Sequence, residues 1–181
     1  DTISDFNLVY TSYAKLNLLE EGFDKKRIFI IGSPLKEVLN EYKSKIDKSK
    51  ILEKLKVNKN NYFLFSLHRE ENVDNDKKFK ILISSIYKIQ KFYGCKIIIS
   101  NHPRFGKKNK KILKNKNIII NKPFGYFDYM KLQKNAYCTI SDSGTIAEES
   151  SIFNFPAIIT SFALDPFLHL RTFFFLLRSI A

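Results

Sequence analysis

The sequence predicts an α/β fold organised around a doubly wound parallel sheet. Short, continuous apolar runs alternate along the chain with segments of helical pattern, which is the arrangement of strand–helix–strand units. The apolar runs contain little polar alternation, as expected of strands that are buried on both faces. The chain has 181 residues, of which 44% are hydrophobic, so it is long enough to bury one sizeable core.

The first elements follow this alternation. A strand is expected at Phe6–Tyr10 and a helix near Ser12–Glu21. A second strand, Arg27–Ile31, leads into a long helical region that runs from Pro34 through about Leu55. Proline suits a helix start, because its φ is already helical and its missing N–H would have no partner there.

Five further strands complete the predicted sheet. They are expected at Tyr62–Leu67, Lys96–Ser100, Asn117–Asn121, Ala136–Ile140 and Pro156–Thr160. Helices are expected between them, near Asp76–Tyr93, Phe105–Lys114 and Phe127–Lys134, and after Ser141. In open sheets of this kind, ligands bind beyond the carboxyl ends of the strands. The residues that follow each strand are therefore the candidates for a site.

The chain is strongly basic, with a formal net charge of +13. Such a charge ordinarily indicates a nucleic acid or an anionic surface as the partner. Most of the basic residues are lysines, however, and arginine occurs only as Arg27, Arg69, Arg104, Arg171 and Arg178. No basic run is interleaved with aromatic residues in the way that a stacking platform requires. We therefore predict no nucleic-acid partner.

The two cysteines, Cys95 and Cys138, each lie in an apolar, strand-like run. We interpret both as buried free thiols of a reducing compartment, which leaves no disulfide framework and no metal site. The apolar run Thr172–Leu177 is far shorter than the about 20 residues that span a bilayer, and we find no signal-peptide pattern. We therefore expect a cytoplasmic location and no membrane partner. Because the sequence starts at Asp1 rather than at methionine, we interpret it as a piece of something longer.

The stretch Ser141–Ser151 is the most informative part of the chain. It follows a predicted strand, and its Ser-Asp-Ser-Gly turn opens a helix, whose first N–H groups attract phosphate. Gly144 lets the backbone approach a ligand closely. Glu149 lies nearly two helical turns beyond Ser143, where it could hydrogen-bond a diol such as ribose. An ordinary helix, capped by Ser143 and with Glu148 and Glu149 near its positive end, remains an alternative.

Polar and aromatic residues follow other predicted strands. These strand ends carry His68-Arg69-Glu70-Glu71-Asn72, Asn101-His102-Pro103-Arg104 and the segment from Lys122 to Tyr129. Two of the three histidines therefore lie at the edge that carries the Ser-Asp-Ser-Gly turn. Together these residues predict a nucleotide site. Its phosphates would lie on helix N–H groups, His68 and Arg69, its base against an aromatic ring and its ribose on a carboxylate.

These segments, in this order, resemble the non-hydrolysing UDP-N-acetylglucosamine 2-epimerase family. The matching motifs are Gly32-Ser33-Pro34, His68 to Asn72, His102-Pro103-Arg104, Pro123 to Tyr129, and Ser141–Ser151 with Phe155-Pro156-Ala157. The Pro-Phe-Gly and Ser-Asp-Ser-Gly-Thr motifs are most similar to the capsule and O-antigen branch, which acts on UDP-linked acetamido sugars. The resemblance extends from about Asp1 to Thr160.

The resemblance implies a GT-B architecture, in which two Rossmann-like domains flank the active site. Residues 1–160 would form the C-terminal, UDP-binding Rossmann-like domain, and residues 161–181 a divergent apolar tail. The complete family enzyme is a homodimer that inverts C2 of the sugar. It eliminates UDP to give a 2-acetamidoglucal and then adds UDP back, without a cofactor.

The resemblance also implies roles for individual residues. By this resemblance, His68 and Arg69 would contact the phosphates, and Ser143 with the Gly144 backbone would hold the pyrophosphate. Glu149 would bind the ribose, and Tyr129 would lie against the uracil. Among these residues only His68 is expected to act in catalysis. The carboxylates that move the C2 proton come from the N-terminal domain of the family, so we expect this chain to be inactive alone.

The sequence departs from the family after the Phe-Pro-Ala strand. The family continues there into an arginine-containing segment with a Glu-Arg-Pro-Glu signature, whereas this chain continues with Ser161–Arg171 and further apolar residues. We interpret this end as a reading-frame change, and Arg171 is not equated with the family's arginine. Two alternatives remain: the nucleotide-sugar domain of a GT-B glycosyltransferase, and a non-catalytic or non-functional gene fragment. The sequence leaves open which acetamido sugar is used.

Overall fold

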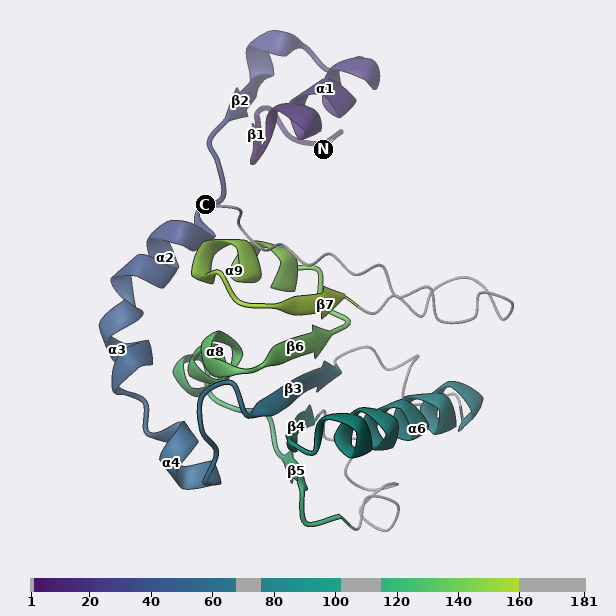
Figure 1. The fold of residues 1–181 in the computed structure, drawn as a ribbon. Coiled ribbons are helices and arrows are strands. Elements are labelled where there is room, and N and C mark those ends of the chain that lie inside the picture. The colour runs from purple at the N-terminus through teal and green to yellow at the C-terminus, as the bar shows by residue number, and fades with distance from the viewer. Residues whose placement is uncertain (1, 68–75, 102–114, 160–181) are drawn as a thin grey trace. The chain divides into compact units, whose positions relative to one another are not determined.

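The structure is a computed structural model in which residues 2–67, 76–101 and 115–159 are described (Figure 1). The chain divides into two compact units, Asp1–Tyr42 and Lys43–Ala181. Each unit has its own parallel sheet, and we describe them one at a time. The predicted helix near Phe105–Lys114 and the residues after Ile159 lie outside the described residues.

The first unit is a small strand–helix–strand arrangement. Its elements are β1 (Asn7–Val9), α1 (Ser12–Glu20), the short 3-10 helix η1 (Lys25–Arg27), β2 (Ile28–Ile30) and α2 (Leu35–Glu41). Thr11 caps α1, because its Oγ1 accepts a hydrogen bond from the backbone N–H of Ala14 at 3.1 Å. β1 and β2 pair in parallel, which confirms the strands predicted at Phe6–Tyr10 and Arg27–Ile31.

The second unit contains a sheet of five parallel strands. They are β3 (Tyr62–Leu67), β4 (Lys96–Asn101), β5 (Ile118–Asn121), β6 (Cys138–Ser141) and β7 (Ala157–Ile159), in the spatial order β5-β4-β3-β6-β7. From β3 the chain adds β4 and β5 on one side, and then returns to place β6 on the other side of β3. This reversal confirms the predicted doubly wound sheet, and all five strands lie within two residues of their predicted positions.

Helices cover both faces of this sheet (Figure 1). They are α3 (Lys43–Lys48), α4 (Ile51–Leu55), α6 (Asp76–Tyr93), α8 (Tyr126–Asn135) and α9 (Ile146–Phe153). On one face α6 packs against Phe63 and Phe65 of β3. On the other face α4 and α8 pack against Tyr62 and Leu64 of the same strand. Successive side chains of a strand point to opposite faces, so a strand covered on both sides is apolar throughout.

The helical region predicted from Pro34 through about Leu55 is confirmed, and the structure divides it into three helices, α2, α3 and α4. The last break lies at Ser49, whose Oγ accepts a hydrogen bond from the backbone N–H of Ile51 at 3.2 Å. That hydroxyl also donates to the carboxylate of Asp128. Serine side chains that bond nearby backbone groups compete with the helix for them. The chain therefore turns here and starts α4.

Both cysteines are free thiols. Cys138 is buried in β6, and burial raises its pKa to about 12. Cys95 is only half-buried, just before β4, so the prediction that both are buried is wrong for this residue. Burial also raises the pKa of Cys95, although a backbone hydrogen bond opposes that effect. In the described part of the chain, no helix has the length and apolar character needed to cross a membrane.

Candidate functional site

The candidate site lies where the strand order reverses, between β3 and β6. Ser66 of β3 and Ser141 of β6 are opposite one another in the parallel register, and both are fully buried. Beyond this pair, the backbone N–H of Asp142 donates to the carbonyl oxygen of Ser66 at 3.4 Å. The carboxyl ends of β3 and β6 therefore lie side by side. Doubly wound sheets bind their ligands at such a switch point.

The turn after β6 leads from Asp142 into α9. The backbone N–H of Ser143 donates to Ser141 Oγ at 3.1 Å, and the hydroxyl oxygens of Ser143 and Thr145 lie 3.0 Å apart. The N-cap of α9 is Thr145 rather than Ser143, so the alternative in which Ser143 caps the helix is wrong. Within the described ranges, the backbone N–H groups of Gly144 and Thr145 donate to no other residue. They remain available for an anion at the helix N-terminus.

Gly144 is not required by the fold itself. Its φ is not positive, and a Cβ placed on it would meet no atom within 4 Å. The residue is exposed at the turn. Neither backbone strain nor crowding demands glycine at this position, and the space in front of the backbone is open.

A cluster of polar side chains lies behind the turn. Tyr129 and Gln133 are one helical turn apart on α8, and Glu149 comes from α9. Gln133 Nε2 donates to Glu149 Oε2 at 2.8 Å. The Tyr129 hydroxyl forms hydrogen bonds with the side chains of Ser66 and Gln133. The cluster thus links the end of β3 to α8 and α9.

Burial is the main reason that the pKa of Tyr129 lies above its ordinary value. The hydrogen bonds from Ser66 and Gln133 lower it, while the charges of Glu149 and Asp142 raise it. The phenol therefore stays protonated at neutral pH. Asp142 is itself only 2% exposed, at the end of β6. Among the described residues, no three His, Cys, Asp or Glu side chains gather in a way that would hold a metal ion.

The structure brings four of the six predicted site residues to the ends of β3 and β6. They are Tyr129, Ser143, Gly144 and Glu149. His68 and Arg69 directly follow β3 in the sequence, but they lie outside the described residues, as do His102 and Arg104. Ser66 and Gln133 also belong to this cluster, although neither was predicted from the sequence. The only available signal was the four-residue spacing of Tyr129 and Gln133, which places both on one helix face.

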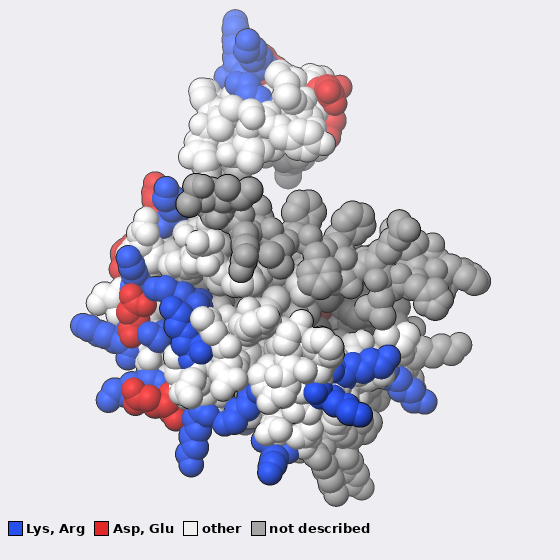
Figure 2. Space-filling model, viewed as in Figure 1, with Lys and Arg blue, Asp and Glu red and all other residues white. Residues whose placement is uncertain are grey.

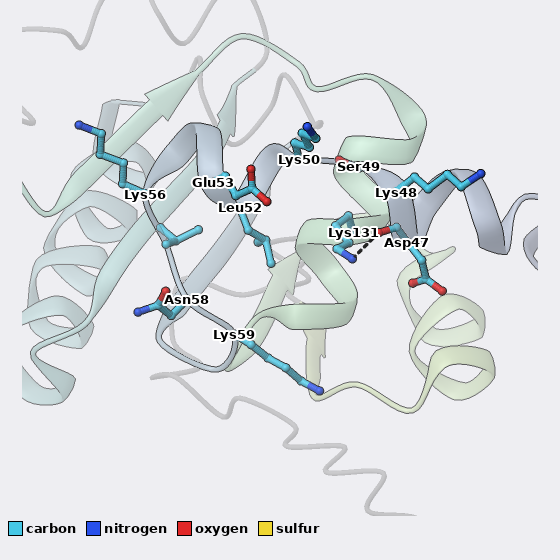
Figure 3. Close-up of a pocket in the computed structure, with 11 residues that line it drawn as sticks. Asp47, Lys48, Ser49, Lys50, Leu52, Glu53, Lys56, Asn58, Lys59 and Lys131 are labelled. Atoms are coloured by element: carbon cyan, nitrogen blue, oxygen red, sulfur yellow. Dashed lines mark hydrogen bonds between the residues drawn. The ribbon is translucent and has the colours of Figure 1, made fainter.

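A separate hollow lies away from this site (Figure 3). It has a volume of about 500 Å³ and is lined by α3, α4, the segment before β3 and Lys131 of α8. Because the segment before β3 is at the amino end of that strand, the hollow lies at the edge of the sheet opposite to the candidate site. Lys131 Nζ donates there to the carbonyl oxygen of Asp47 at 2.9 Å. None of the predicted site residues lines it.

Basic side chains are spread over the visible face of the second unit in several separate groups (Figure 2). Acidic residues lie among the groups near α3 and α4. One pair is ionic: Lys134 Nζ is 2.9 Å from Asp47 Oδ1. The pKa of Asp47 lies below its ordinary value, chiefly because Lys134 donates a hydrogen bond to its carboxylate.

Comparison with known proteins identifies close similarity to one family. Residues 1–161 match the sequence profile described as UDP-N-acetylglucosamine 2-epimerase. Among curated relatives, the UDP-N-acetylglucosamine 2-epimerase of Methanocaldococcus jannaschii is 36% identical over 173 residues, which cover 87% of this chain and 46% of the relative. The enzyme of the same name from Methanococcus maripaludis is 37% identical over 169 residues, with the same coverage. The chain thus spans a little less than half the length of these relatives.

Solved structures give the same result. The UDP-N-acetylglucosamine 2-epimerase from Rickettsia bellii is 40% identical with a TM-score of 0.76, and the match covers 86% of this chain and 42% of that one. The M. jannaschii UDP-GlcNAc 2-epimerase in complex with UDP-GlcNAc and UDP is 35% identical, also with a TM-score of 0.76. That match covers 87% of this chain and 45% of the other. The α/β fold therefore corresponds to about half of an epimerase chain.

Proposed function

Because the chain belongs to the UDP-N-acetylglucosamine 2-epimerase family, we propose that it forms the C-terminal, UDP-binding half of a UDP-acetamido-sugar 2-epimerase. The observation that carries this proposal is the position of the Ser143-Gly144 turn. It lies at the switch point of the sheet, at the N-terminus of α9, with the Glu149 carboxylate on the same helix. The phosphate, ribose and base contacts would then come from residues after β3 and β6 and from α8 and α9.

The turn would hold the pyrophosphate. The backbone N–H groups of Gly144 and Thr145 and the hydroxyl of Ser143 are donors, and the positive end of the α9 dipole favours the negative charge. We propose that His68 and Arg69 add side-chain contacts to the phosphates, since they directly follow β3 in the sequence. For these two residues the proposal rests on the sequence motif alone.

The cluster behind the turn would hold the uridine. Glu149 Oε2 is bound to Gln133, while its Oε1 makes no hydrogen bond to another residue of the described segments. We propose that this carboxylate binds the ribose hydroxyls. Tyr129 has its hydroxyl in the polar cluster and is half-buried, and we propose that its ring lies against the uracil.

The proposed reaction inverts C2 of the sugar by elimination and re-addition. In the elimination, the bond from C1 to the UDP oxygen breaks, the C2 proton passes to a base, and a C1–C2 double bond forms. Negative charge grows on the departing pyrophosphate, so donors that hold it more tightly in the transition state lower the barrier. The proton transfer needs a base within hydrogen-bond reach of C2. We propose that this base belongs to the other half of the complete enzyme.

The finer assignments are also proposals. The Pro-Phe-Gly and Ser-Asp-Ser-Gly-Thr motifs favour the capsule and O-antigen branch, with a UDP-linked acetamido sugar as the substrate. We propose that the complete enzyme is a homodimer, as the family resemblance implies, and that residues 161–181 form a divergent tail, since the sequence departs from the family after Thr160. The two free thiols favour a cytoplasmic location.

Calorimetric titration of the full chain with UDP and with uridine tests the phosphate site. We expect Ser143→Ala to weaken UDP binding several-fold and to leave uridine binding unchanged, because uridine has no phosphates. Ser84→Ala is the matched control, since Ser84 lies exposed on α6. If Ser143→Ala binds UDP as tightly as the parent chain does, the assigned phosphate site is wrong.

A further inference from the structure

Gln133 is a fully buried amide whose buried neighbours on α8, Met130 and Leu132, are apolar. Its Nε2 donates to Glu149, but its Oε1 has no hydrogen-bond partner among the described residues. A buried polar atom without a partner costs free energy. Leucine would avoid that cost at this position, so packing alone does not explain the glutamine.

The surroundings fix the direction in which this amide points. Glu149 lies on one side of it and the Tyr129 hydroxyl lies close by. A carboxylate only accepts hydrogen bonds when it is ionised, so it attracts the amide N–H₂ and repels the amide oxygen. Nε2 must therefore face Glu149. Tyr129 is in turn bonded to Ser66, which is fully buried at the end of β3.

This arrangement constrains only one side of the Glu149 carboxylate. Oε2 accepts the bond from Gln133 at 2.8 Å, whereas Oε1 has no partner in the described segments. Glu149 is half-buried, so its carboxylate can still be reached from solvent. A side chain that is already ordered loses less conformational entropy when a ligand binds.

We propose that Gln133 is a positioning residue for nucleotide recognition. It holds Oε2 of Glu149 so that Oε1 is presented to the 2′- and 3′-hydroxyls of the ribose. The proposal rests on the proposed function, in which Glu149 binds the ribose. It adds that the contact depends on a residue of α8 that does not itself touch the nucleotide.

The test compares two nucleotides on the full chain. Calorimetry gives the Kd of UDP and of 2′,3′-dideoxy-UDP, which lacks both hydroxyls, for the parent chain, Gln133→Leu and Gln90→Leu. Gln90 is the matched control, because it is a half-buried glutamine of α6 that accepts from Asn115 Nδ2 at 3.2 Å, outside the candidate site. Gln133→Met, which is similar in length and more flexible, repeats the test if Gln133→Leu does not fold.

We expect the parent and Gln90→Leu to bind UDP about tenfold more tightly than the dideoxy nucleotide, as the loss of a well-made hydrogen-bond pair predicts. In Gln133→Leu this ratio should fall close to one, with the affinity for dideoxy-UDP unchanged. A purely structural role would weaken both nucleotides equally and leave the ratio intact.

One result would overturn the positioning role: a Gln133→Leu chain that keeps the parent's ratio, whether its two affinities match the parent's or are both weakened equally. A different result would overturn the ribose contact itself. If the parent chain does not distinguish UDP from dideoxy-UDP, Glu149 does not bind the ribose, and the proposed function is wrong at that residue.

Discussion

Tyr62 of β3 donates its hydroxyl proton to the carbonyl oxygen of Leu132 in α8, with the two oxygens 2.7 Å apart. Both residues are fully buried. Burial raises the pKa of Tyr62, so this hydroxyl is a permanent donor at physiological pH. This hydrogen bond connects α8, which carries Tyr129 and Gln133, to β3, the central strand of the sheet.

Tyr62→Phe should therefore destabilise the fold. Removing the hydroxyl leaves the buried Leu132 carbonyl without this donor, which costs about 1–3 kcal/mol. Urea denaturation followed by circular dichroism measures the loss. Tyr137→Phe is the control, because Tyr137 is 48% exposed and should change stability little. Equal stability of the two variants would mean that the bond does not anchor α8.

Gly144→Ala should separate binding from folding. Since the φ of Gly144 is not positive and its surroundings are open, alanine should keep stability or raise it by about 0.5 kcal/mol. The gain would arise because alanine lowers the conformational entropy of the unfolded chain. UDP binding should still weaken about tenfold, because the new methyl group occupies the space that a phosphate would use. Calorimetry and thermal melting on the same protein give both quantities.

Gly94→Ala is the control for that experiment, with the opposite pattern. Gly94 follows α6 with a φ of 64°, where alanine costs about 1–2 kcal/mol. Stability should fall, and UDP affinity should stay at the parent value. A Gly144→Ala chain that binds UDP normally would show that no ligand approaches the turn closely.

The two thiols should differ in reactivity. Cys138 is buried with a pKa of about 12, whereas Cys95 is half-buried. Because the thiolate is the reactive form, iodoacetamide at pH 8 should label the folded chain once, at Cys95, and the chain in denaturant twice. Mass spectrometry of tryptic peptides distinguishes the sites. Labelling of Cys138 as fast as Cys95 in the folded chain would contradict this assignment.

The same raised pKa predicts a loss of stability in alkali. The folded chain keeps the Cys138 proton up to pH about 12, whereas the unfolded thiol loses it near its ordinary pKa of 9.0. The folded state therefore binds more protons across this interval, and its stability falls as the pH rises. Cys138→Ala should remove this part of the pH dependence in denaturation curves collected between pH 8 and 11.

The full chain should not exchange the C2 proton of UDP-N-acetylglucosamine. We propose that the base for this proton lies in the other half of the enzyme, and an absent base leaves the C–H bond intact. Incubation in D₂O followed by mass spectrometry of the nucleotide sugar detects any exchange. A full-length relative serves as the positive control. Deuterium at C2 with this chain alone would place a base among its own residues.

The sequence predicted the five-stranded sheet well, because its central strands are covered on both faces. Such strands are apolar at every position, as Tyr62–Leu67 shows with helices packed on either side. The breaks between α2, α3 and α4 were harder to predict. The last depends on Ser49, whose hydroxyl is also bonded to Asp128, a residue far away in the sequence.

The candidate site was predicted where it depends on local sequence. The turn at Ser143-Gly144 is visible as a motif, because a strand, a glycine turn and a helix start are consecutive in the chain. Gln133 carries no such signal. A glutamine in a helix is ordinarily a surface residue, and its burial here results from a tertiary contact between α8 and α9.

The register that pairs Ser66 with Ser141 fixes the distance between the ends of β3 and β6, whatever the length of the chain that connects these strands. Neighbouring strands are about 4.8 Å apart, so the distance between the ends of β3 and β6 is set by this one strand pair rather than by β4, α6 and β5, which lie between them in the sequence. Insertions just after α6 or just before β5, at the edge of the sheet opposite to the site, should leave the distance between the ends of β3 and β6 unchanged. A one-residue deletion inside β6 should abolish it, because every later side chain of that strand would point to the opposite face.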